Sequence, residues 1–319
     1  MKSLAFVAAL VASPAFADMK IEIPFEAQIG GQPLSCAASY ADIGTTKSTV
    51  QVADFRVYVS NFRMIGADGS EMPVALDNDG TWQLDGTALL DFEDGTGTCS
   101  NGTVETNMVV RGTVPDGAYA GLLFDIGVPF AQNHGDPTLA ASPLNLTAMF
   151  WSWQAGYKFI KVDMATSGQP LPPPMKMGMA SGDMASGDMA SGDMASGDMA
   201  KADDAKGMDM SGPMGWEIHL GSTGCASDSQ TTSPKDQCAN PNRIAVKLDG
   251  FMPGMEGMDK VVLDPAPVLA AANVDVNAKE TMPGCMAFPG DADCPPVMSA
   301  LGLSYEGAAP GTQVFATLH

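Results

Sequence analysis

Residues 20–27 read Lys-Ile-Glu-Ile-Pro-Phe-Glu-Ala, and polar and apolar side chains alternate along them. Successive side chains of a β-strand point to opposite faces, so this alternation predicts a strand with one buried face. A second run, from Phe55 to Phe62, is rich in β-branched and aromatic residues, which favour strands. Together the two runs indicate a fold built on β-sheets.

The same kind of pattern continues along the chain. Further strand-like runs cover residues 106–113, 118–128, 148–162, 215–220, 243–248 and 313–318. Asp-Gly and Asn-Gly pairs, which are typical turn residues, separate several of them. Few segments have a helical period, and 266–272 fits either a helix or a turn into a strand. We predict a mostly β fold, an antiparallel β-sandwich with long loops.

The 319-residue chain is strongly acidic, with 37 Asp and Glu, 16 Lys and Arg, and a formal net charge of −21. Such a surface repels nucleic-acid phosphates and anionic lipids, which disfavours binding to either. The 35 Gly and 23 Pro residues suit a turn-rich β protein better than a helical one. The 23 Met residues are unusually many, and their location decides what they mean.

The first 17 residues have the features of a secretory signal peptide. Lys2 precedes an apolar run at 4–11, and Ala15-Phe16-Ala17 supplies small residues for cleavage before Asp18. No later stretch reaches the roughly 18 consecutive apolar residues of a membrane span. We therefore expect an exported protein; the short signal with its A-x-A site favours the bacterial periplasm, and secretion is the alternative.

Residues 168–214 differ from the rest of the chain. They contain the period-five repeat Met-Ala-Ser-Gly-Asp, and ten of the 23 Met residues lie between Met175 and Met214. Small and acidic residues bury too little surface to offset chain entropy, so we expect a disordered insertion rich in Met, Asp, Gly and Ser. The expected organisation is a signal peptide, two parts of one sandwich and the insertion between them, with bounds 1–17, 18–167, 168–214 and 215–319.

The chain has six cysteines. If it is exported to an oxidising compartment, this even number indicates disulfides. Many connectivities are open. Short loops favour Cys225–Cys238 and Cys285–Cys294, which leaves Cys36–Cys99. A thiolate metal site is the alternative, but the sequence contains no C-x-x-C pair to support it.

Familiar catalytic motifs are absent from the sequence, which has no P-loop, G-x-S-x-G, H-E-x-x-H or G-x-G-x-x-G. Three His residues leave little room for acid–base catalysis. Asp91, Glu93 and Asp94 form an acidic cluster that we interpret as a solvated strand end and turn; its spacing does not match an EF-hand calcium loop. We expect a protein that is not an enzyme.

Two histidines and a tryptophan pair remain as candidates. His134 lies in a loop and His219 in a strand, and by pattern alone both are more typical of structural or surface residues than of ligands. Trp151 and Trp153 fall in the run 149–159, which as one strand would place both indoles on the same core face. Imidazole and thioether are, however, the donors that exported copper sites use.

Several strings, in this order, resemble those of the MbnP family, the four-Cys member of the "metallo-mystery pair". They are F-R-V-Y-V-S at 55–60, L-D-F-E-D at 90–94, N-H at 133–134, S-P-L-N at 142–145, M-F-W-S-W-Q-A-G-Y-K-F at 149–159, H-L-G-S-T-G-C at 219–225 and P-G-C-M at 283–286, with Cys294. The similarity spans residues 19–305 apart from the insertion. The tryptophan string and the H-x-G-S-T-x-C string carry most of its specificity.

The resemblance implies a periplasmic copper-binding protein with an MbnH-like partner, a di-haem c-type cytochrome similar to MauG enzymes and bacterial peroxidases. In the family this partner oxidises a Trp of the copper protein to kynurenine, which then helps to bind the metal. Carried over to this chain, Trp151 or Trp153 is the modified residue, and His134 and His219 are the imidazole ligands. Two neutral imidazoles and an aryl amine would suit three-coordinate Cu(I).

The Met-rich insertion departs from the family pattern. Its thioethers are soft donors that suit Cu(I), with Met208 and Met210 as a close pair, and Met252, Met255 and Met258 add a three-residue spacing. Repeat expansion without a function explains the insertion equally well. For the whole chain, the alternative to copper binding is a disulfide-stabilised structural or adhesion module without metal.

Overall fold

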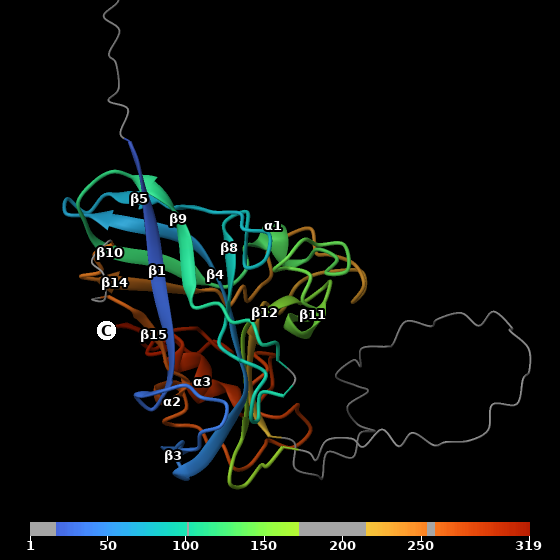
Figure 1. The fold of residues 1–319 in the computed structure, drawn as a ribbon. Helices are drawn as coiled ribbons and strands as arrows, with labels where there is room; N and C mark the ends of the chain where they lie inside the picture. Colours follow the sequence, from blue (N-terminus) through green and yellow to red (C-terminus); the bar gives the residue numbers. More distant parts are fainter. Residues whose placement is uncertain (1–16, 101, 172–214, 254–258) are drawn as a thin grey trace, which may run out of the picture.

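The computed structural model describes residues 17–100, 102–171, 215–253 and 259–319. In these ranges the chain forms two β-sheets with a few short helices, which confirms the predicted mostly β fold (Figure 1). The predicted signal peptide before residue 17 lies outside the described residues, as do Met208, Met210, Met255 and Met258. None of the described helices has the length and apolarity that crossing a membrane requires.

The larger sheet is organised around one long strand, β4 (Ser48–Gly66), which contacts most of the others. The main path runs β11 (Phe150–Ser152), β12 (Gly156–Ala165), β4, β10 (Tyr119–Ile126) and β14 (Ile244–Asp249). Off this path, β13 (Trp216–Gly221) pairs with β12; β3 (Tyr40–Ile43), β5 (Glu71–Pro73) and β8 (Thr87–Asp91) pair with β4; and β7 (Gln83–Leu84) pairs with β8.

The smaller sheet has the order β16 (Ala316–Leu318), β15 (Val261–Leu263), β1 (Asp18–Ile29), β9 (Val109–Pro115) and β6 (Ala75–Leu76), with β2 (Gln32–Pro33) paired to β1. β1 and β15 run parallel, whereas the other strand pairs of the described chain are antiparallel. The last strand is shorter than the sequence pattern predicts, because it begins at Ala316.

The main core lies between the two sheets. Ile21, Ile23, Phe25 and Ala27, the alternating apolar residues of the opening run, are buried, as that pattern predicts. Phe25 of β1 makes edge contacts with Phe62 and Phe124 of the larger sheet, with ring centroids 6.4 and 5.7 Å away. These contacts join the sheets into one sandwich.

A second apolar cluster lies on the other face of the larger sheet. Tyr58 of β4 belongs to it, whereas its neighbours Val57 and Val59 face the main core. This cluster holds the segment that contains α1 (Phe130–Asn133) and the 3-10 helix Thr147–Met149. The segment therefore lies over the sheet next to β11 and β12.

The tryptophan run is a hairpin, so the prediction of one continuous strand is wrong. β11 ends at Ser152, the chain turns, and Phe150 pairs with Tyr157 of β12. Gly156 adopts φ = +82°, and a Cβ there would lie 2.4 Å from the Asn133 carbonyl oxygen, so the turn requires glycine. Trp151 consequently lies on β11 and Trp153 in the turn.

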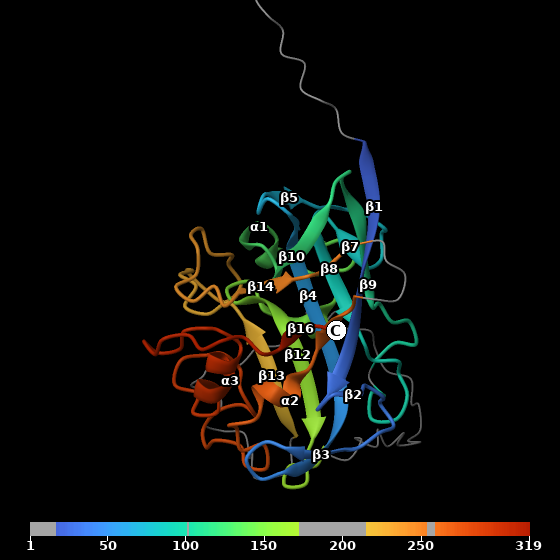
Figure 2. The same ribbon diagram turned by 90° about the vertical axis from the view of Figure 1, so that its left-hand side faces the viewer.

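The C-terminal part contains two short helices. α2 (Pro265–Val268) begins at the N-cap Asp264, and turns follow it, which resolves the ambiguous 266–272 segment as a short helix and turns. α3 (Cys294–Ala300) follows the cysteine-bracketed loop. Residues near Cys285 run along β13, with backbone hydrogen bonds to Glu217 and His219. Figure 2 shows this C-terminal region beside β13.

All three predicted disulfides are formed. They join Cys36 to Cys99, Cys225 to Cys238 and Cys285 to Cys294. The first ties the loop before β3 to the loop after β8. The other two fasten loops at the β13 edge of the larger sheet, where the candidate residues lie.

Candidate metal centre

The indole of Trp151, a residue of β11, packs against the end of strand β13. A Cβ on Gly221 would be 2.5 Å from Cζ3 of Trp151, so the indole rests directly on the glycine backbone. The ring also contacts Phe288, with centroids 5.0 Å apart. Because Gly221 and His219 are two residues apart on one strand, the indole lies on the face to which His219 points.

His219 faces two carboxylates. Its Nε2 lies 2.7 Å from Asp163 Oδ1 on β12 and 3.3 Å from Glu217 Oε2 on β13. The three ligand atoms lie within 4.8 Å of one another, which makes this a candidate metal-binding group. His219 is only 7% exposed, and burial lowers its pKa, which favours the neutral imidazole.

A buried ion network stands behind this cluster. Asp163 Oδ2 accepts a hydrogen bond from Lys161 Nζ at 2.5 Å, and Lys161 also contacts Asp54, which pairs with Arg56. Burial raises the pKa of Asp163, but hydrogen bonds from His219 and Lys161, together with the Lys161 charge, outweigh it and hold this pKa below its ordinary value. Burial and the Asp163 charge raise the pKa of Glu217 to about 8.

His134 directly follows α1 and is 6% exposed. Its Nδ1 lies 3.0 Å from the carbonyl oxygen of Trp153, and a carbonyl only accepts, so Nδ1 carries the hydrogen. The lone pair is therefore on Nε2, which accepts from Asn133 Nδ2 at 3.2 Å. Burial lowers the pKa of His134, which favours its neutral form as well.

The disulfide Cys225–Cys238 lies against His134. Cys238 Sγ is 3.6 Å from His134 Nε2, and these three residues form a second group of close ligand atoms. Cys285, Asp291 and Cys294 form a third. All six cysteines of the chain are in disulfides, so neither group offers the thiolates that a thiolate metal site requires.

The two histidines belong to different groups of ligand atoms, but their segments are joined. Asn133, which precedes His134, donates a hydrogen bond from Nδ2 to Ser222 Oγ at 3.3 Å. Ser222 follows Gly221, on which Trp151 rests. The structure thus brings Trp151, His219 and His134 around the end of β13, while the ring of Trp153 packs against the second apolar cluster.

The acidic cluster after β8 is largely buried, so its interpretation as a solvated strand end is wrong for two of its three members. Asp91 and Glu93 are 3% and 0% exposed, because β4 pairs Arg56 with Asp91 in register. Arg56 Nε lies 3.1 Å from Glu93 Oε1. Burial raises the pKa of Asp91 to about 6 and that of Glu93 to about 8. Asp94 does act as a turn residue, accepting from Thr96.

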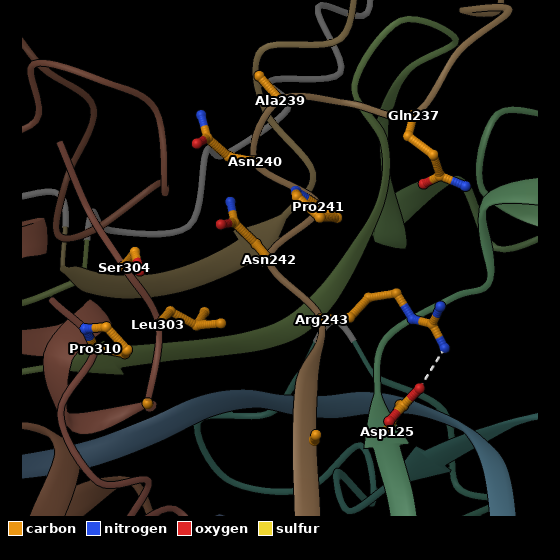
Figure 3. Close-up of a pocket in the computed structure, with 12 residues that line it drawn as sticks. Asp125, Gln237, Ala239, Asn240, Pro241, Asn242, Arg243, Leu303, Ser304 and Pro310 are labelled. Carbon is orange, nitrogen blue, oxygen red and sulfur yellow. Dashed lines mark hydrogen bonds and ion pairs between the residues drawn. The ribbon is translucent and has the colours of Figure 1, made fainter. Parts of the chain in front are cut away.

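A cleft of about 590 Å³ adjoins the end of β13, between residues 237–243 and the 302–310 loop (Figure 3). Arg243 pairs with Asp125 across its wall at 2.5 Å. Asn242 connects the cleft to the centre, because its Nδ2 donates to the Gly221 carbonyl at 2.8 Å. The cleft contains none of the ligands predicted from sequence, and Met252, the one auxiliary Met in the described ranges, is exposed on the surface.

Two functional candidates were missed by sequence reasoning, Asp163 and Glu217. Their signal was present, since Glu217 lies inside one strand-like run and Asp163 directly after another, two residues from His219 and Lys161 respectively. Alternation places such pairs on one face, and a buried face must neutralise its charges. Asp163 and Glu217 meet because β12 and β13 pair in the observed register, which the sequence pattern does not reveal.

Fold and site together define a disulfide-bonded β-sandwich with candidate metal-ligand clusters at one edge of its larger sheet. The model of the MbnP family matches residues 18–287, so the chain belongs to the MbnP family. Among solved structures, MbnP from Methylosinus trichosporium is similar, with 25% sequence identity and a TM-score of 0.70. That match covers 95% of this chain and 98% of the other. No curated protein sequence matches the chain.

Proposed function

We propose that this protein is exported to the periplasm and binds one Cu(I) ion through His134, His219 and a kynurenine formed from Trp151. Membership of the MbnP family supports this role. In the proposal an MbnH-like di-haem cytochrome oxidises the tryptophan, and the chain itself is a copper carrier and the substrate of that oxidation, not an enzyme.

The arrangement at the end of β13 is the observation that carries the proposal. Trp151 rests on Gly221, on the same face as His219, and the Asn133–Ser222 hydrogen bond ties the His134 segment to the same point. Both imidazoles are buried, and burial lowers both pKa values. Neutral nitrogen donors shielded from water suit a soft monovalent ion such as Cu(I).

Trp151 is a better substrate for the partner than Trp153. Its ring contacts Phe288, which is 43% exposed, so the indole lies close to a surface at which another protein can dock. Trp153 packs its ring against the second apolar cluster, and its carbonyl already holds His134. Oxidation of Trp151 would introduce an aryl amine beside His219, whereas oxidation of Trp153 would disturb a structural contact.

The chemistry of the modification needs an external oxidant, which we take to be peroxide used at the partner's haems. Cleavage of the indole C2–C3 bond adds two oxygen atoms and forms N-formylkynurenine, while two molecules of peroxide are reduced to two of water. Hydrolysis then consumes one water and releases formate, leaving kynurenine. The residue gains about 4 Da in total.

Intact mass and peptide mapping of protein from the native host test the modification. Fragment ions of the peptide that contains both residues should place a gain of about 4 Da on Trp151 and none on Trp153. The matched control is the Trp151→Phe protein, which should show no mass gain. Modification only at Trp153, or at neither residue, would contradict the proposed substrate.

A further inference from the structure

His219 is held by a carboxylate through one specific ring nitrogen. Its Nε2 lies 2.7 Å from Asp163 Oδ1, and the other oxygen of Asp163 accepts from Lys161 Nζ at 2.5 Å. A carboxylate that already accepts from an ammonium group acts as an acceptor for the imidazole too. The hydrogen of His219 therefore resides on Nε2, and the lone pair resides on Nδ1.

The carboxylate is itself fixed by the sheet. β12 pairs Lys161 with Arg56 and Asp163 with Asp54 in register, and Lys161 also contacts Asp54. On the other side, Lys161 is paired with His219 of β13. Three adjacent strands thus hold the chain of contacts that ends at His219, and the side chains of Asp54 and Arg56 are nearly inaccessible to water.

We propose that Asp163 is a positioning residue for the copper site, and that His219 binds the metal through Nδ1 and not through Nε2. This inference rests on the proposed function. It deepens that function, because it names the donor atom and the group that orients it. A ligating imidazole commonly donates its other N–H to a carboxylate, which fixes the ring orientation and raises the basicity of the donor nitrogen.

The two histidines then bind the metal through different ring nitrogens. In each ring, one N–H donates to a protein oxygen and the other nitrogen keeps the lone pair. The Trp153 carbonyl engages Nδ1 of His134 and leaves Nε2 with the lone pair, whereas Asp163 engages Nε2 of His219 and leaves Nδ1. Glu217 is the weaker neighbour, because its Oε2 is 3.3 Å from the ring nitrogen. Asp163 is therefore the orienting carboxylate, and the exposed Glu105, outside the cluster, supplies the control carboxylate.

The first test uses the metal-free wild-type chain, labelled with 15N-histidine. The chain has only three histidines, so the His219 signals can be assigned as those that disappear in the His219→Gln protein. Long-range 15N–1H NMR should show His219 as the Nε2–H tautomer. Observation of the Nδ1–H tautomer would overturn the inference, whether or not the protein binds copper.

The second test uses variants and a Cu(I) competition titration against a chromophoric chelator, with kynurenine-bearing protein. Asp163→Asn should lower Cu(I) affinity about 10- to 100-fold, and Asp163→Ala should also release the fixed tautomer. Glu105→Gln, which removes an exposed carboxylate outside the cluster, should leave both the tautomer and the Cu(I) affinity unchanged.

The outcomes separate the inference from the proposed function. Equal affinity in wild type and Asp163→Asn, with copper bound, would overturn the positioning role alone. Absence of Cu(I) binding in the modified wild type would overturn the proposed function, while the tautomer in the metal-free protein still decides the role of Asp163. Should Asp163→Ala fail to fold, the wild-type tautomer and the isosteric Asn variant remain decisive.

Discussion

Glu93 shows at the scale of one residue how the fold changes chemistry. Its side chain is fully buried, and within the described part of the chain neither carboxylate oxygen has a hydrogen-bond partner. Burial, together with the charges of Asp54 and Asp91, raises its pKa to about 8 despite the nearby Arg56. The folded protein therefore keeps a proton on Glu93 at pH values where the unfolded chain has lost it.

Because the folded protein keeps this proton on Glu93, its free energy of unfolding should decrease as the pH rises. Stability is highest below the ordinary pKa of a glutamate and is lost as pH rises toward 8, because ionising the buried group costs free energy. Glu93→Gln mimics the protonated form. Between pH 5 and 9 the wild-type free energy of unfolding should fall about 2 kcal/mol more than that of the variant.

Urea denaturation at several pH values measures this difference. Glu105→Gln serves as a control, because Glu105 is exposed and should leave the pH profile unchanged. Parallel profiles for wild type and Glu93→Gln would show that Glu93 ionises normally in the folded state.

Gly221 is the second residue on which the site depends. A Cβ there would lie 2.5 Å from the Trp151 ring and 2.7 Å from the Tyr157 carbonyl oxygen. Gly221→Ala should therefore displace the indole, lower stability by about 1–3 kcal/mol and reduce kynurenine formation. Denaturation and intact mass measure the two effects. Gly117→Ala, where a Cβ meets only ordinary contacts, should change neither; a Gly221→Ala protein that behaves the same way would contradict the proposed packing.

At the scale of elements, the sequence predicted strands well and their pairing poorly. Alternation located β1, β10, β13 and β14, because half-buried strands carry that period directly. The tryptophan run alternates too, and only Gly156 distinguishes the hairpin from a strand. Loop length was enough to predict the disulfides. The burial of Asp91 depends on the register between β4 and β8, which no local pattern contains.

The loop closed by Cys225–Cys238 supports the His134 side of the site. Cys238 Sγ lies 3.6 Å from His134 Nε2, and the Ser233 hydroxyl in the same loop donates a hydrogen bond to the His134 carbonyl oxygen at 2.5 Å. The double variant Cys225→Ser, Cys238→Ser should lose about 3 kcal/mol of stability and also weaken Cu(I) binding.

The disulfide Cys36–Cys99 provides the comparison, since its two cysteines lie in the loops before β3 and after β8. Replacing both by Ser should lower stability by a similar or larger amount, about 4 kcal/mol, and leave Cu(I) affinity unchanged. Denaturation and chelator competition on both proteins provide the readouts. Equal losses of Cu(I) affinity in the two double variants would show that the loop at His134 has no specific role in copper binding.

At the scale of the whole molecule, the Met-rich insertion leaves and re-enters the sandwich at one point. Leu171 Cδ2 lies 3.1 Å from the position of a Cβ on Gly215, so the two described ends of the gap are in contact. The insertion joins neighbouring strands, β12 and β13, which a short connection can also join. The fold therefore does not depend on the 43 residues from 172 to 214 to span a distance.

Replacing residues 172–214 by a short Gly/Ser linker should preserve the fold, with a change in unfolding free energy below about 1 kcal/mol. The tight Cu(I) site should remain. Denaturation and a full Cu(I) titration test both statements. Weaker copper equivalents present in the full chain and lost on shortening would assign the thioethers, including Met208 and Met210, as auxiliary donors. A shortened protein that fails to fold would contradict this account of the insertion.

The central claim is that His134 and His219 hold one Cu(I) ion beside a kynurenine at the end of β13. Competition with a chromophoric Cu(I) chelator measures it most directly, on kynurenine-bearing wild type and on the His134→Ala, His219→Ala double variant. We predict one tight Cu(I) per wild-type chain and none in the double variant. Undiminished binding by the double variant, or no tight binding by the modified wild type, would contradict the claim.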